Sequence, residues 1–272
     1  MYRSLAMVLS VLLLAGCSSG FFKIPREEYR QTVRTLGVLP LLVDADSTIT
    51  HPEREAVVDI LRRTSAGREG KLSELLRENK TYFDVRPVAG DPRQLYAEVV
   101  KGSSLRGEGE GLYRHYDFAE ASVAALAQRH VVDALLIVIL NGVERQDKRW
   151  DRLHLNYLQS NFNDIVATAA VVLPSGEVIW EYPGTGADKF LALQYPDFDE
   201  AYYNSTDQVR VKYITAAGLE RTLEEVERGV FGKGEFSRRY LRQFSLIAAE
   251  LKPGLQNPFK AKEPVSPALN GK

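Results

Sequence analysis

Two kinds of apolar pattern alternate along the chain: short runs that are almost uninterrupted, and longer stretches in which apolar residues recur every three or four positions. Residues 35–43 (TLGVLPLLV) and 131–140 (VVDALLIVIL) are of the first kind, which is typical of strands covered on both faces. We predict an interior strand over 133–140, with Ile137 fully buried. Because Pro40 has no N–H for a sheet ladder, the first strand's pairing must end there or lie at an edge.

Helical spacing occurs in five segments. Residues 53–63 and 71–78 predict two short amphipathic helices. Residues 209–226 and 236–251 predict two longer ones. Asp117 stands where a capping residue is expected, so we predict a helix that starts there and leads directly into the central strand.

The remaining segments predict further strands and one loop. Residues 82–88 predict a strand, and residues 164–173 and 177–182 flank a Pro-Ser-Gly turn, which predicts a β-hairpin. Residues 145–152 (RQDKRWDR) mix both charge signs around one tryptophan, which predicts a solvated loop. This order of elements predicts a single α/β domain over 31–252, in which helices cover one or both faces of a mixed β-sheet.

The amino terminus has the three-part layout of a signal peptide. Arg3 precedes an apolar run too short to span a bilayer, and small residues follow it. The tetrapeptide Leu14-Ala15-Gly16-Cys17 resembles the bacterial lipobox, which implies a signal peptide over 1–16 and lipid, such as palmitate, on Cys17. By resemblance to enterobacterial lipoproteins, Ser18 in the next position implies the periplasmic face of the outer membrane.

Two flanking segments are predicted to lie outside the domain. Residues 17–30 predict a short lipid-anchored tether, in which Phe21 and Phe22 either enter the lipid interface or pack on the domain. Residues 253–272 contain four prolines and few apolar side chains, which predicts a disordered tail. Since Cys17 is the only cysteine, no internal disulfide can form and packing alone must hold the fold.

Three segments carry a resemblance to a known scaffold. Residues 33–40 (VRTLGVLP), 132–137 (VDALLI) and 165–180 (IVATAAVVLPSGEVIW) resemble the scaffold shared by the amino-terminal domain of TolB and the periplasmic domain of the CsgG curli-secretion lipoprotein. This resemblance implies a non-enzymatic role in envelope assembly, secretion or cell-wall-synthase regulation. The pattern shows none of the long membrane-crossing hairpins of the curli channel, which argues against a pore.

Composition and motifs exclude several classes of function. The 35 basic and 36 acidic residues nearly cancel, so we expect no nucleic-acid partner. The four histidines are scattered without metal-binding spacing, and Asp44 with Asp46 is more typical of a turn than of a cation site. The glycine-rich segments 107–111 and 184–186 lack the features of phosphate or dinucleotide loops, so we expect no cofactor.

An aromatic segment with interspersed acidic residues, 190–203 (FLALQYPDFDEAYY), is the strongest candidate for recognition. Exposed tyrosine and phenylalanine suit a binding surface for a peptide, a glycan or a protein. We therefore predict partner contacts at Tyr195, Phe198, Tyr202 and Tyr203. The alternative is a long loop whose rings fold back onto the sheet.

Three functions remain open at this stage. The first is a lipid-anchored scaffold or accessory protein of the cell envelope that binds another envelope component, with a protein or glycan as partner. The second is a periplasmic hydrolase of cell-wall or polysaccharide material, for which Asp197, Asp199 and Glu200 are the clustered carboxylates. The third is a carrier of a small ligand, which requires an apolar cavity.

Overall fold

The computed structural model describes residues 21–183, 189–229 and 232–252. The predicted signal peptide, Cys17, the predicted tail and the 184–186 glycine segment lie outside these ranges.

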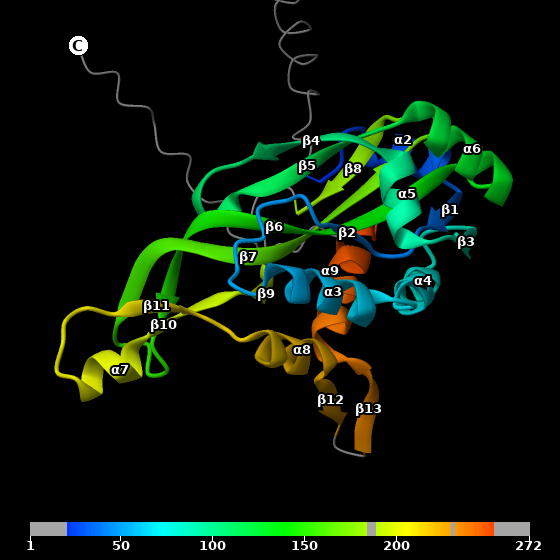
Figure 1. Cartoon of the computed structure of the whole chain (residues 1–272). Helices are drawn as coiled ribbons and strands as arrows, with labels where there is room; N and C mark the ends of the chain where they lie inside the picture. Colours follow the sequence, from blue (N-terminus) through cyan, green and yellow to red (C-terminus); the bar gives the residue numbers. More distant parts are fainter. Residues whose placement is uncertain (1–20, 184–188, 230–231, 253–272) are drawn as a thin grey trace, which may run out of the picture.

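A mixed sheet with strand order β3-β1-β6-β7-β8 forms the centre of the molecule (Figure 1). β1, β2 and β3 are parallel to their partners, whereas β7 is antiparallel to β6, β8 and β9. This confirms a single α/β domain with a mixed sheet. The strands of this sheet are β1 (Thr35–Val38), β2 (Leu42–Asp44), β3 (Asp84–Pro87), β6 (Ala134–Trp150), β7 (Tyr157–Val172), β8 (Val178–Tyr182) and β9 (Lys189–Ala192).

The break at Pro40 divides the first apolar run into two strands that pair with the same neighbour. β1 pairs with β6 through Leu136, and β2 resumes the pairing at Ile139. The lack of an N–H at Pro40 explains the gap, because the ladder cannot continue through a proline. The prediction that pairing ends there is confirmed.

Both faces of the sheet are covered by other elements. One face packs on α2 (Arg26–Thr32), α3 (Arg54–Ser65), α4 (Glu69–Glu78), α8 (Ala216–Glu224) and α9 (Arg238–Leu251). The other packs on α5 (Pro92–Val99), α6 (Glu120–His130) and strand β5 (Tyr113–Phe118), which pairs with β4 (Val100–Arg106). Side chains of β6 alternate between the two cores, and Ile137 has no exposed surface, as predicted.

Two helix predictions are wrong in their starting points. Asp117 lies in β5, where it pairs with Gly102, and the helix α6 begins only at Glu120 without a side-chain cap. The predicted helix 209–226 is three elements: β11 (Arg210–Tyr213), α8, and β12 (Val226–Gly229), which pairs with β13 (Gly232–Ser237). α8 starts late because the side chain of Thr215 accepts a hydrogen bond from the Gly218 N–H and so fixes the N-terminus there.

The predicted tether is wrong for its residues from Phe21 onward, which belong to the folded body. Phe22 forms a bridge with Trp180 at the sheet edge and is 2% exposed. Tyr29 on α2 is fully buried, with its hydroxyl 2.7 Å from that of Tyr82. Of the two alternatives for Phe21 and Phe22, packing on the domain is therefore the one observed, and burial of these rings stabilises the edge strand β8.

The largest departure from the prediction is a two-stranded arm. β6 and β7 continue beyond the sheet as one hairpin, paired without interruption from Val143 and Asp164 to Trp150 and Tyr157 (Figure 1). We call residues 143–164 the arm and residues 150–157 its tip. The predicted loop 145–152 therefore lies mostly in a strand. The described chain thus has a long hairpin. The sequence pattern predicted the absence of long membrane-crossing hairpins, and that absence and the argument against a pore stay predictions.

Candidate partner-binding surface

The inner face of the arm carries a buried cluster of charges. Along β6, Val143, Arg145, Asp147 and Arg149 point inward and are buried, whereas the residues between them are more exposed. Asp164 on β7 has no exposed surface. Because buried charges are costly unless paired, each member should have a partner.

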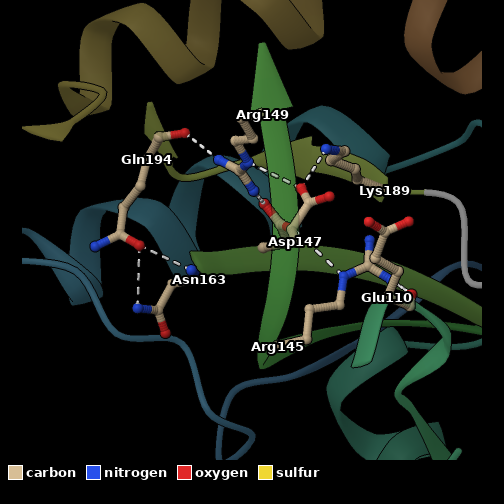
Figure 2. Close-up of polar contacts among 8 residues, drawn as sticks. Glu110, Arg145, Asp147, Arg149, Asn163, Lys189 and Gln194 are labelled. Carbon is tan, nitrogen blue, oxygen red and sulfur yellow. Dashed lines mark hydrogen bonds and ion pairs between the residues drawn. The ribbon is translucent and has the colours of Figure 1, made fainter. Parts of the chain in front are cut away.

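Each carboxylate of the cluster is held by at least two basic groups. Asp164 accepts a hydrogen bond of 2.6 Å from Arg149 Nη2 and lies 3.4 Å from Arg145 Nε. Asp147 accepts one of 2.9 Å from Arg149 Nε and another from Lys189 (Figure 2). The Arg149 guanidinium also lies 3.8 Å from the Phe162 ring centroid.

Arg145 and Arg149 each donate a further hydrogen bond to a backbone carbonyl of a segment that is distant in sequence. Arg145 Nη1 donates to the carbonyl of Glu110 at 2.6 Å, and Arg149 Nη1 donates to the carbonyl of Gln194 (Figure 2). Glu110 lies in the short 3-10 helix η1 (Gly109–Gly111). The glycine-rich segment 107–111 thus contributes a backbone acceptor that supports the arm.

The same cluster attaches the aromatic segment to the arm. The Gln194 side-chain oxygen accepts hydrogen bonds from the N–H of Asn163, at 2.8 Å, and from its Nδ2, at 3.3 Å. Gln194 begins β10 (Gln194–Asp197), which leads into α7 (Phe198–Tyr203) and pairs with β11. From Gln194 onward, the aromatic segment is therefore part of a β-α-β unit that is fixed to the inner face of the arm.

We expect the charge cluster to make the folded protein less stable at acid pH. Burial by itself raises the pKa of Asp147, but the bonds from Lys189 and Arg149 outweigh it and hold this pKa below its ordinary value. A carboxylate whose pKa is lower in the folded protein than in the unfolded chain stabilises the fold fully at pH values above its ordinary pKa, about 3.9. This stabilisation is lost as pH falls through the lower pKa of the folded state. Asp147→Asn should therefore cost about 1–3 kcal/mol at neutral pH, and this cost should shrink as pH falls through the lowered folded pKa of Asp147.

Urea unfolding of both proteins between neutral and acid pH measures this difference. Asp207→Asn, at an exposed position, is the matched control and should follow the wild type at every pH. Parallel loss of stability in wild type and Asp147→Asn across the acid range would contradict the assignment.

The four predicted contact residues differ in exposure. Tyr202 and Tyr203 on α7 are 80% and 81% exposed, with ring centroids 5.5 Å apart. Tyr195 on β10 is also exposed, and Phe198 is half-buried. Folding of rings back onto the core occurs only earlier in the segment, at Phe190, whose ring contacts Tyr240.

Sequence reasoning missed a second group of exposed apolar residues, at the arm tip. Trp150, Leu153, Leu155 and Tyr157 are all exposed there. The tip lies beside α7, because Arg152 forms an ion pair of 3.6 Å with Asp199 (Figure 1). Hydropathy gave no signal for this hairpin, since its inward positions are charged and only the ends of its strands are apolar.

Exposed large apolar side chains are concentrated at this end of the molecule. Ten such residues occur in the described part of the chain, and only Phe83, Leu105 and Val131 lie elsewhere. A concentration of this kind on a folded surface marks an interaction site. We call it the arm-end surface, and its residues are Trp150, Leu153, Leu155, Tyr157, Tyr195, Tyr202 and Tyr203.

The three clustered carboxylates are engaged in structural contacts. Asp197 caps α7 by accepting from the Glu200 N–H at 3.0 Å, and Lys212 pairs with both Asp197 and Glu200. The hydrogen bond from Lys212 holds the pKa of Asp197 below its ordinary value. Because Lys212 pairs with both Asp197 and Glu200, these two carboxylates act as structural partners of one lysine, and this arrangement does not support the hydrolase hypothesis. The adjacent cavity of about 280 Å³ is lined mainly by polar side chains and is not the apolar cavity that the small-ligand carrier hypothesis requires.

The other candidate motifs have structural explanations. Asp44 accepts a hydrogen bond from the Asp46 N–H at 3.1 Å, which is the predicted turn. Among the residues that the structure describes, no three His, Cys, Asp or Glu side chains converge as metal ligands. Within the same ranges, every helix is too short or too polar to cross a membrane.

Comparisons with known proteins give only distant similarities. No protein-family model and no curated protein matches the chain. A putative neuraminyllactose-binding hemagglutinin homolog from Helicobacter pylori is 9% identical with a TM-score of 0.34, over 80% of this chain and 86% of that one. A PelC dodecamer from Paraburkholderia phytofirmans is 14% identical with a TM-score of 0.24, over 58% and 73%. Similarities at this level leave the function open.

Proposed function

We propose that the protein is a lipid-anchored scaffold or accessory protein of the outer membrane, which faces the periplasm and binds another envelope component through the arm-end surface. The observation that carries this proposal is the concentration of exposed aromatic and apolar side chains at one end of the fold. Tyrosine and tryptophan dominate binding energy at protein interfaces. The TolB-like and CsgG-like sequence pattern is consistent with an assembly role.

The buried charge cluster supports this proposal by making the surface rigid. A binding site whose side chains are already ordered loses less conformational entropy when a partner docks. Arg149 connects the arm and β10 in one network, so the aromatic rings of α7 and the arm tip keep a fixed relation. We infer that the arm is a device for presenting this surface.

The position of the surface relative to the anchor also supports the proposal. Phe22, at the start of the described chain, bridges to Trp180, which pairs with Val171 on β7. The tip residue Tyr157 lies 14 residues further along this strand, a path of about 45 Å at 3.3 Å per residue. The arm-end surface therefore stands well away from the end that carries the lipid.

The anchor is tested at Cys17. We expect Cys17→Ser to abolish labelling of the protein by a fatty-acid analogue, because the thiol is the attachment point of the diacylglyceryl group. Gel fluorescence after metabolic labelling measures this, with Ser18→Ala as the control that should still be labelled. Label that persists on Cys17→Ser would refute the lipoprotein assignment.

The partner surface is tested by photo-crosslinking in living cells. We expect a photoreactive amino acid at Tyr202 to give a discrete higher-mass adduct, since this side chain is exposed at the arm end. The matched control is Phe83, which is 88% exposed but lies away from α7 and should give none. Equal adducts at both positions, or none at Tyr202, would contradict the proposal.

A further inference from the structure

The arm tip presents leucines where a soluble turn normally has polar residues. Leu153 and Leu155 are 76% and 74% exposed on the turn that joins β6 to β7. Trp150 and Tyr157 face each other across the last strand pair, with ring centroids 5.1 Å apart. Their exposure has no structural explanation within the described chain, because none of the four contributes to either core.

The backbone of this turn is satisfied from within. The Asp151 carboxylate accepts from the N–H groups of Leu155, at 2.9 Å, and Asn156, at 3.2 Å, while the Asp151 N–H donates to the Asn156 carbonyl at 2.9 Å. The His154 N–H donates to the Asp151 carbonyl at 3.2 Å. A segment that enters a poorly hydrated region must satisfy its polar backbone internally, and this turn largely does so.

Two basic side chains flank the apolar apex: Lys148 lies behind it on β6, and Arg152 lies in the turn itself, next to Leu153. The Lys148 ammonium lies 4.5 Å from the Trp150 ring centroid and 3.7 Å from that of Tyr157. Arg152 has a side chain that is 91% exposed. Of the neighbouring acids, Asp151 is engaged in the turn and Asp199 pairs with Arg152 at 3.6 Å. Leucines at the apex, aromatic rings behind them and basic side chains long enough to reach the headgroups are the kinds of side chain found at the surface of an anionic bilayer.

We propose that the arm tip enters the interfacial layer of an anionic lipid bilayer. Leu153 and Leu155 reach the boundary of the acyl chains, Trp150 and Tyr157 lie among the headgroups, and Lys148 and Arg152 contact lipid phosphates. This proposal goes beyond the proposed function, because it divides the arm-end surface: the four tip residues contact lipid, and Tyr195, Tyr202 and Tyr203 remain for the envelope partner.

The shape of the tip favours lipid over a protein occupant. Four exposed side chains on one hairpin end are far fewer than the roughly 20–30 residues that each partner contributes to a stable protein interface. A bilayer needs no complementary pocket and accepts a convex apolar wedge. Cys17 is so close to Phe21 in sequence that extended chain can separate them by at most about 14 Å. In this proposal the lipid on Cys17 and the arm tip contact the same membrane from the two ends of the molecule. The arm then lies along the membrane surface.

Tryptophan fluorescence provides a direct test, because the chain has only two tryptophans and Trp180 is fully buried. The protein is the chain from residue 17 onward with Cys17→Ser, which keeps every described element and has no lipid. Mixed with vesicles of phosphatidylcholine and phosphatidylglycerol, it should show a blue shift and quenching by brominated acyl chains. Trp150→Phe should abolish both signals.

Matched variants separate this proposal from the proposed function. Leu153→Ser with Leu155→Ser should weaken vesicle binding at least tenfold, while Phe83→Ser, the loss of an equally exposed ring elsewhere, should leave it unchanged. Tyr203→Ala should keep vesicle binding, and with the photoreactive amino acid at Tyr202 it should lose the partner adduct that the same probe gives in the otherwise wild-type protein.

Two results would overturn the lipid assignment. One is a failed vesicle experiment, in which either the wild type shows no quenching or the leucine variant binds as the wild type does. The other is a photoreactive group at Leu153 that crosslinks in native membranes to a protein and not to lipid.

Discussion

Asp164→Ala is expected to lower the free energy of unfolding by about 3–5 kcal/mol, among the largest effects of any single substitution in this chain. Asp164 is fully buried and is the shared partner of Arg145 and Arg149, whose side chains are also buried. Its removal leaves both guanidinium groups without that anion in a site that little water can reach. An uncompensated buried charge costs more than the original pair contributed.

Urea unfolding monitored by circular dichroism measures this loss. The control is Asp199→Ala, which removes an exposed carboxylate with a single surface ion pair and should change stability by less than about 1 kcal/mol. Because Arg149 also binds the Gln194 carbonyl, limited proteolysis of the Asp164 variant should cut first between β10 and β11. A variant as stable and as resistant to protease as the wild type would show that the cluster does not hold the arm.

Ile137→Ala is expected to cost about 2–5 kcal/mol, from lost burial and from the cavity that remains. Ile137 lies in the part of β6 at the centre of the sheet, opposite Ala170 of β7 and between the segments that pair with β1 and β2, and packs in the core beneath α5 and α6. The strands and helices around Ile137 are fixed by their own packing, so they cannot shift enough to fill the cavity. The loss is a large share of the net stability of a domain.

Tyr202→Ala is the control, because its ring is exposed on α7 and should contribute less than about 1 kcal/mol. Chemical denaturation of both variants gives the comparison. A neutral Ile137→Ala together with an unfolded Tyr202→Ala would invert the assignment of core and surface, and the partner-binding proposal would fail with it.

The sheet was predictable from sequence where apolar residues alone define a strand. The central part of β6 is covered on both faces, so every position is apolar and the run is recognisable without any partner. The hairpin between β7 and β8 was predictable for another local reason: Gly176 has a φ of +80°, which the Pro-Ser-Gly turn anticipates. The break between β1 and β2 was also predictable from one residue, because Pro40 has no N–H to donate to a neighbouring strand.

The helix α5 and the strands β4 and β5 were missed, although α5 has a local signal. Asp91 caps it by accepting from the N–H groups of Arg93 and Gln94, and Pro92 occupies its first turn. The β4–β5 pair has no continuous apolar face, because most of β4 is exposed. Its strand character depends on pairing with β5 and on the Thr168 hydroxyl, which donates to the Arg114 carbonyl at 2.9 Å.

Of the candidate site, the sequence determined by itself that an aromatic segment exists and that its tyrosines suit recognition. It did not determine that this segment is ordered, since the residues that order it lie far away in the chain. Arg149 reaches Gln194 across 45 positions, and Lys189 reaches Asp147 across 42. Contacts of this separation have no signature in local composition.

What the sequence alone determined about this protein is the central apolar sheet, the turns that proline and glycine impose, and the segments rich in one kind of side chain. Only the tertiary structure decided that residues 145–150 (RQDKRW) form a strand. The inward side chains of this strand, Arg145, Asp147 and Arg149, are charged. They can be buried only because folding places Asp164 and Lys189 beside them. The same pairing places Trp150 and Leu153 next to α7 and so creates the arm-end surface. Hydrophobic pattern is a property of each residue, whereas charge compensation is a property of residues that folding brings together.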